Sequence, residues 1–148
     1  MQTRLAEQYS NTPLGKQADK VLRSCVHCGF CNATCPTYQL LGDELDGPRG
    51  RIYLIKQVLE GNAISSKTQT HLDRCLTCRS CETTCPSGVD YHNLLDIGRA
   101  VVDAAPRLLA SPDGWLLHDC GAEGQVAAVP RSQFHQAVLR IQAVIMQL

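Results

Sequence analysis

Residues 25–36 read CVHCGFCNATCP, and residues 75–86 read CLTCRSCETTCP. Each of these two cysteine stretches has the spacing C-x2-C-x2-C-x3-C-P, and the second begins fifty positions after the first. Apart from the cysteines and the proline, only Thr34 and Thr84 match between them. The two stretches therefore form an internal repeat, and what they share is the spacing of the cysteines.

This spacing is typical of a cubane [4Fe–4S] cluster. Three cysteines separated by two residues let one tight loop bind three irons, and the fourth iron needs a thiolate from elsewhere. In bacterial two-cluster ferredoxins the fourth cysteine of each run ligates the other cluster. The same crossed arrangement here predicts two clusters, each with four ligands. The first set is Cys25, Cys28, Cys31 and Cys85, and the second set is Cys75, Cys78, Cys81 and Cys35.

Structural zinc is the competing interpretation of these cysteines. Zinc usually takes two C-x2-C pairs, or mixtures with histidine, in a closed tetrahedron. Three cysteines within seven residues would crowd one zinc ion, although two zinc ions with four cysteines each would use all eight. A disulfide framework does not call for this spacing, and clustered cysteines in a reducing compartment indicate metal ligands. We therefore favour two [4Fe–4S] clusters.

The composition narrows the class of protein further. The chain has 148 residues, with 14 basic and 14 acidic side chains, which gives no electrostatic reason to expect nucleic acid as a partner. The polar N-terminus lacks the apolar stretch of a secretory signal, and no apolar run approaches the roughly 18 residues of a membrane span. We expect a cytoplasmic protein without a transmembrane segment. Only 5% of residues are aromatic, so we expect cluster binding to be a condition of folding.

Helical periodicity dominates the chain up to residue 105, which predicts a mainly α, helical ferredoxin-like domain around the two clusters. Helices are predicted over residues 14–24, 66–74 and 91–104, the last one capped by Asp90. A further helix is expected between Pro48 and Gly61. Its apolar stripe is Ile52, Ile55, Val58 and Leu59, and the charged residues expected mostly on its other faces are Arg49, Arg51, Lys56 and Glu60.

The chain after residue 105 has a different character. Residues 106–131 combine Pro, Gly and small residues with Trp115 and Cys120 and show no clear period, which predicts a loop or linker. From Ser132 onward, apolar positions at helical spacing predict a terminal helix that runs to the last residue. A helix that ends within its apolar stripe favours a fragment of a longer protein. The predicted domains are therefore 1–105, with both clusters, and 106–148, the start of a further C-terminal region.

Several polar residues near the cysteines have more than one possible role. Arg74 and Arg79 bring positive charge to the second stretch, where each could tune a cluster potential or be a solvated surface residue. We favour the surface for Arg79. His27 lies between two ligands, but four cysteines are already assigned, so we interpret it as a loop residue, and Cys120 as an ordinary free thiol. The other histidines are scattered and suggest no metal site: His71, His92, His118 and His135.

The sequence lacks the features of a catalytic chain. It has no G-x-G-x-x-G for a flavin or nicotinamide and no P-loop. Its carboxylates and histidines form no recognisable pair of nucleophile and base, and it has no basic patch or recognition helix that would indicate a redox sensor on DNA. Two clusters without a substrate site indicate electron relay, with catalysis on another chain.

Two segments resemble a known family. Residues 25–62 (CVHCGFCNATCPTYQLLGDELDGPRGRIYLIKQVLEGN) and 71–99 (HLDRCLTCRSCETTCPSGVDYHNLLDIGR) closely resemble the iron–sulfur subunit of bacterial glycolate dehydrogenase (glycolate oxidase). The cluster spacing alone is shared with many ferredoxin-type subunits. The connecting DELDGPRGRIYLIK, residues 43–56, is the more specific signal, although relatives for glycerol 3-phosphate or lactate oxidation carry similar segments.

The resemblance implies a helical ferredoxin domain like that of succinate dehydrogenase iron–sulfur subunits. It also implies FAD-binding partner subunits that oxidise glycolate to glyoxylate. Electrons would pass through the two [4Fe–4S] clusters toward a quinone at the cytoplasmic face of the inner membrane. The alternatives are an iron–sulfur subunit of a related glycerol 3-phosphate or lactate dehydrogenase, and a free-standing ferredoxin-like carrier.

Overall fold

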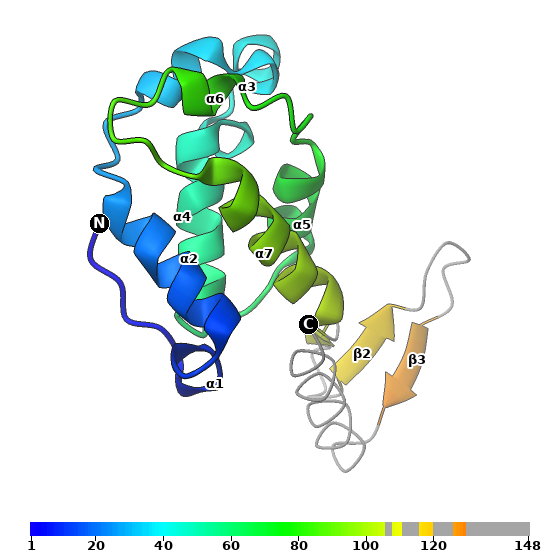
Figure 1. Cartoon of the computed structure of the whole chain (residues 1–148). Coiled ribbons are helices and arrows are strands. Elements are labelled where there is room, and N and C mark those ends of the chain that lie inside the picture. The colour runs from blue at the N-terminus through cyan, green and yellow to red at the C-terminus, as the bar shows by residue number, and fades with distance from the viewer. Residues whose placement is uncertain (106–107, 111–115, 120–125, 130–148) are drawn as a thin grey trace. The chain divides into compact units, whose positions relative to one another are not determined.

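The computed structural model describes residues 1–105, 108–110, 116–119 and 126–129. The chain forms two units, Met1–Val102 and Asp103–Leu148. Among the described residues, the helices and both cysteine stretches lie in the first unit, apart from the end of the last helix, and the second unit contains three short strands (Figure 1). The boundary predicted at residue 105 stays a prediction.

The four longest helices occupy the positions that the periodicity predicts. They are α2 (Pro13–Ser24), α4 (Pro48–Leu59), α5 (Ser66–Asp73) and α7 (Tyr91–Ala104). Proline stands in the first turn of α2 and of α4, where its fixed φ suits a helix start. The side chain of Thr12 caps α2 by accepting a hydrogen bond from the backbone N–H of Gly15. The prediction of a mainly α domain is confirmed.

Five shorter helical elements were not predicted from the sequence. They are α1 (Glu7–Ser10), η1 (Phe30–Thr34), α3 (Pro36–Leu41), η2 (Glu44–Asp46) and α6 (Ser80–Thr83). Elements this short offer too few positions for an apolar period to be visible. Four of them lie within or just after the cysteine stretches, so they belong to the surroundings of the candidate site.

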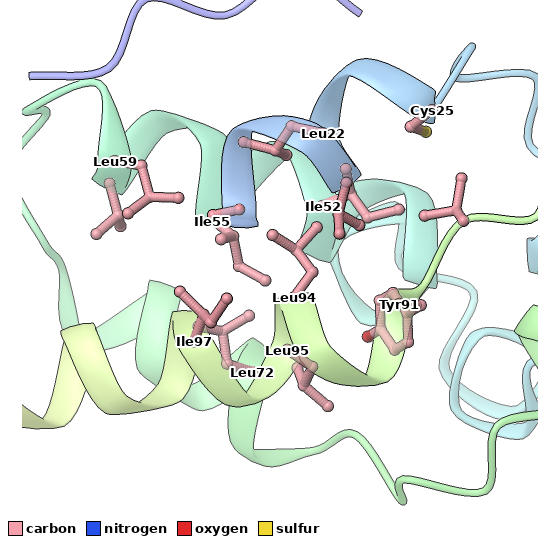
Figure 2. Close-up of a cluster of buried hydrophobic side chains, with 14 of the residues drawn as sticks. Leu22, Cys25, Ile52, Ile55, Leu59, Leu72, Tyr91, Leu94, Leu95 and Ile97 are labelled. Carbon is pink, nitrogen blue, oxygen red and sulfur yellow. The ribbon is translucent and has the colours of Figure 1, made fainter. Parts of the chain in front are cut away.

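The apolar core lies where α2, α4 and α7 meet (Figure 2). Leu22, Ile55 and Leu94 are each fully buried and point toward one another from these three helices. Burying a leucine or isoleucine side chain stabilises the fold by about 1.5–3 kcal/mol. At Gly98 of α7 a Cβ atom would lie 2.5 Å from Cγ1 of Ile55, so the glycine allows α7 to approach α4 closely. Cys25 extends this core to the cysteine stretches.

The second unit contains strands in the segment for which a loop was predicted. The strands β1 (Leu108–Ala110), β2 (Leu116–Asp119) and β3 (Val126–Val129) form an antiparallel sheet in the order β1-β2-β3. The loop prediction is therefore wrong for these residues, because runs of three or four residues show no alternation in the sequence. The predicted terminal helix from Ser132, together with Trp115, Cys120 and His135, lies outside the described residues.

Across the described part of the chain, no helix combines the length and the apolar character that crossing a membrane requires.

Candidate metal centre

Both cysteine stretches begin where a helix ends. Cys25 follows the last residue of α2, and Cys75 comes directly after Arg74, the C-cap of α5. The two stretches then make the same backbone hydrogen bonds, each 3.2 Å long. These run from N–H to C=O in the pairs Cys25–Leu22, Cys75–Leu72, Cys35–Asn32 and Cys85–Glu82. The internal repeat is therefore also a repeat of backbone conformation.

The turns between the cysteines use left-handed backbone at matching positions. The φ angles are 61° at His27 and 87° at Gly29 in the first stretch, and 53° at Thr77 and 60° at Arg79 in the second. Such a conformation costs an L-residue about 1–2 kcal/mol. In the described chain, every non-glycine residue with positive φ lies in these two stretches. Local strain of this kind concentrates at functional sites.

Two cavities of about 20 Å³ each lie against these stretches. The cysteines of the first set line one cavity, which we call the first site: Cys25, Cys28, Cys31 and Cys85. Those of the second set line the other, which we call the second site: Cys35, Cys75, Cys78 and Cys81. The two cavities are adjacent, since Pro48, Cys81 and Tyr91 line both of them. The assignment of these cysteines as ligands stays a prediction.

The thiols differ in burial and in pKa. Cys25, Cys35 and Cys81 are buried, whereas Cys28 and Cys78 are exposed. Burial raises the pKa of the Cys31 thiol to about 11, and the nearby charge of Cys25 adds to the rise. Burial and then the charges of Cys75 and Cys31 raise the pKa of Cys81 to about 12. Thiolates that repel one another in a partly buried site are a donor set that a cationic metal core stabilises.

One polar atom of the first site has no partner. Nε2 of His27 is buried and makes no hydrogen bond within the described chain, and the His27 ring lies 6.0 Å from that of Tyr53. The residue lines the first cavity. Buried polar atoms are nearly always satisfied, so a hydrogen-bond acceptor held in the first site would fit this nitrogen. This is a second observation, besides the thiols, that fits a sulfur-rich group.

A buried arginine lies behind the second site. Arg51 of α4 belongs to the charged residues that were expected mostly off the apolar stripe, but its side chain is 0% exposed. Its Nε donates to the carbonyl of His71 at 2.6 Å, and its Nη1 donates to Oγ1 of Thr37 at 3.2 Å. The same Nη1 lies 3.9 Å from Sγ of Cys35. The sequence did carry a signal, since position 51 falls on the stripe that continues through Ile55 and Val58.

Asp46 is the anionic partner of this arginine. Its carboxylate lies 3.6 Å from Nη2 of Arg51 and 3.0 Å from Nη1 of Arg74, and it is 3.0 Å from Nδ1 of His71. Burial alone would raise the pKa of Asp46, but the hydrogen bonds from His71 and Arg74 outweigh it and lower the pKa. Asp43, Asp46 and His71 are close enough to share a cation. The two arginines already neutralise Asp46, so we assign no metal there.

Further polar groups face the second stretch. The hydroxyl of Tyr91, a residue that is 4% exposed, donates to Sγ of Cys75 at 3.5 Å. Arg99 donates to the backbone carbonyl of Cys75 at 2.9 Å. Arg79 has a 60% exposed side chain and pairs with Glu82 at 2.8 Å, so it lies at the surface. Tyr91 and Arg99 had no signal in the sequence, because they lie outside the cysteine repeat.

Part of the chain is similar to a known protein family. Residues 21–89 match the family described as a 4Fe-4S dicluster domain. The matched residues span both cysteine stretches and the connecting segment, and this similarity favours iron–sulfur clusters over structural zinc.

Three curated proteins are similar to the chain. It is 75% identical over 103 residues to the glycolate oxidase iron-sulfur subunit of Escherichia coli, which covers 70% of this chain and 25% of that protein. It is 45% identical over 83 residues to the probable glycolate oxidase iron-sulfur subunit of Bacillus subtilis, covering 55% and 19%. It is 30% identical over 76 residues to the succinate dehydrogenase iron-sulfur subunit of Paracoccus denitrificans, covering 47% and 29%. The chain thus spans less than a third of each relative, and no solved structure matches it.

Proposed function

We propose that this chain is an electron-transfer part of a flavin-dependent glycolate dehydrogenase. One observation carries the proposal: 75% identity over 103 residues to an E. coli protein named as a glycolate oxidase iron-sulfur subunit. The second relative, from B. subtilis, has a name of the same kind. Two relatives from different bacteria with the same named role favour glycolate over the related substrates lactate and glycerol 3-phosphate.

In this proposal each site holds one [4Fe–4S] cluster. The first set of cysteines binds the first cluster and the second set binds the second, which the lining of the two cavities supports. A bound [4Fe–4S] cluster supplies reversible one-electron chemistry. The residues of the chain supply thiolate donors and a largely apolar, partly closed wall. Cys81 and Tyr91 line both sites and so keep them adjacent.

Oxidation of the substrate is then assigned to partner chains. FAD-binding subunits would oxidise glycolate to glyoxylate and reduce the clusters, and a quinone or another membrane acceptor would take the electrons. Several carboxylates of the described chain are paired with arginines or lysines, as at Asp46 and Glu60. This engagement leaves them no evident role as a base. We place the complex in the cytoplasm, peripheral to the inner face of the membrane.

The experiment is purification of the tagged chain, coexpressed with candidate flavoproteins, followed by anaerobic addition of glycolate. We expect a flavoprotein to copurify and the visible absorbance of the clusters to decrease with glycolate. Lactate and glycerol 3-phosphate are added in parallel, and faster bleaching by either would assign the complex to that substrate instead. A chain that binds no flavoprotein and exchanges electrons with unrelated enzymes would be a free-standing carrier.

A further inference from the structure

We infer that Arg51 and Tyr91 are positioning residues that hold the second site at a higher reduction potential than the first. The inference rests on the proposed function, because it requires that both sites hold iron–sulfur clusters. With clusters bound, one electron would pass from the first site to the second, so that the first cluster is oxidised by one electron and the second is reduced by one electron. No bond forms or breaks, and no proton moves.

The first step of the argument is the position of the Arg51 charge. Its guanidinium is 0% exposed and lies 3.9 Å from the sulfur of Cys35, which belongs to the second set. Charges interact more strongly in a buried environment than in water. A reduced cluster carries one more negative charge than an oxidised one, so a fixed cation beside its ligand favours the reduced form.

The second step is that this charge is held in place. The donors of Arg51 are engaged by the carbonyl of His71, by Oγ1 of Thr37 and by the carboxylate of Asp46. Asp46 would cancel the positive charge if it paired with Arg51 alone, but it also pairs with Arg74 at 3.0 Å. Two guanidinium groups share one carboxylate, so the network keeps a net positive charge next to the second site.

The third step is the hydrogen bond from Tyr91. Its hydroxyl donates to Sγ of Cys75 at 3.5 Å, and the residue is 4% exposed, so water competes little for the bond. Hydrogen bonds to the ligand sulfurs of an iron–sulfur cluster are among the factors that set its potential. Arg99 adds a second cation on the same side, since it donates to the carbonyl of Cys75 at 2.9 Å.

The first site also has a hydrogen-bonding group, Nε2 of His27, which offsets the hydrogen bond from Tyr91, but its positively charged groups are weaker. Arg49 lines it, but this side chain is 34% exposed and pairs with Glu44 at 2.5 Å, which cancels its charge locally. The N-terminal ammonium donates to the backbone carbonyl of Cys25 at 2.7 Å, as Arg99 does to that of Cys75, so these two cations offset each other in the comparison of the sites. Within the described residues, no charged side chain is hydrogen-bonded to a sulfur of the first set. The electrostatic difference between the sites therefore favours the reduced form of the second.

The test is a redox titration of the full chain, reconstituted anaerobically and followed by electron paramagnetic resonance. Iron and sulfide are measured first, and Cys35→Ser identifies the signal of the second site. We expect the second site to be reduced at the higher potential. Tyr91→Phe and Arg51→Met should each lower that potential and leave the first site unchanged. Arg51→Lys, which keeps the charge, should lower it less.

The control is Tyr53→Phe, since Tyr53 lies on the same helix as Arg51 and is 43% exposed. It should change neither potential. The inference is overturned if the first site has the higher potential in the native chain, or if Tyr91→Phe and Arg51→Lys shift neither site or both equally. These two conservative variants decide the question even if Arg51→Met does not fold. A chain without iron would refute the proposed function itself, whereas a loaded chain with equal potentials refutes only this inference.

Discussion

The two cysteine stretches have the same backbone but different surroundings. Equivalent hydrogen bonds and left-handed turns recur fifty residues apart, although His27 and Gly29 are replaced by Thr77 and Arg79. The first site is bordered by the exposed side chains of Val26 and Phe30, whereas the second is backed by buried Arg51. The cysteine spacing therefore accounts for the shared backbone of the two stretches, and residues outside the repeat account for their different electrostatic environments.

Replacing the fourth cysteine of either stretch should have the largest effect on cluster content. Cys35→Ser should remove the second cluster and leave the first, and Cys85→Ser should do the reverse, because each cysteine lines the cavity of the other stretch. Each variant should retain about half of the iron. Electron paramagnetic resonance of the reduced variants distinguishes the two sites. If Cys35→Ser removed the signal that Cys25→Ser also removes, the crossed arrangement would be wrong.

Substitution of Asp46, in the buried network with Arg51 and Arg74 behind the second site, should have the next largest effect. Asp46→Asn leaves two arginines without a carboxylate and should lower the free energy of unfolding by about 3–5 kcal/mol, with preferential damage to the second site. Asp43→Asn, in the same segment, is the matched control. Asp43 is exposed and accepts a hydrogen bond from the N–H of Leu45, which asparagine can also accept, so little change is expected.

The pH dependence of this effect follows from the lowered pKa of Asp46. In the unfolded chain an aspartate has a pKa of about 3.9. Because the folded pKa lies lower, the stabilisation is complete above the unfolded value and is lost as the pH falls through the folded value. Denaturant unfolding should therefore give the same difference between wild type and Asp46→Asn at pH 7 and at pH 5. A smaller difference at pH 5 would mean that burial dominates and raises the pKa.

Alanine substitutions in the left-handed turns of the two stretches should change the unfolding free energy by smaller amounts, which differ between Gly29 and Arg79. Gly29→Ala places a side chain at φ 87° and a Cβ atom 2.7 Å from Nη1 of Arg49, so it should destabilise the loaded chain by about 1–2 kcal/mol. At the equivalent position, Arg79→Ala should leave the unfolding free energy nearly unchanged, because that residue already has a positive φ and loses only a surface ion pair. If thermal unfolding showed the same loss of stability in Gly29→Ala and Arg79→Ala, the expected difference between the two turns would be wrong.

Much of the fold could be predicted from the sequence because it follows local patterns. The helices α2, α4 and α7 were predicted from their apolar periods, and α5 was predicted as a short helix that leads into Cys75. The short helices around the cysteines and the strands β1 to β3 have no such period. Their positions depend on hydrogen bonds with other segments, as in the register that pairs Leu117 with Ala128.

The candidate site was predictable in its ligands but not in its surroundings. The cysteine spacing, together with the crossed ligation of two-cluster ferredoxins, predicted the two sets of cysteines that line the two cavities. Arg51 was grouped with the charged residues expected mostly off the apolar stripe of α4, although its spacing from Ile55 and Val58 indicated burial. Its partners Asp46 and His71 come from other elements, so no local pattern brings the three together. Tyr91 likewise reaches Cys75 only through the tertiary fold.

The most direct test is the content of iron and acid-labile sulfide in the full chain after anaerobic reconstitution. Two four-thiolate sites should give about eight irons and about eight sulfides per chain, with the brown absorbance of [4Fe–4S] clusters. A chain that binds about four irons would contradict the presence of two sites. A colourless chain that takes up only zinc would contradict iron–sulfur chemistry at either of them.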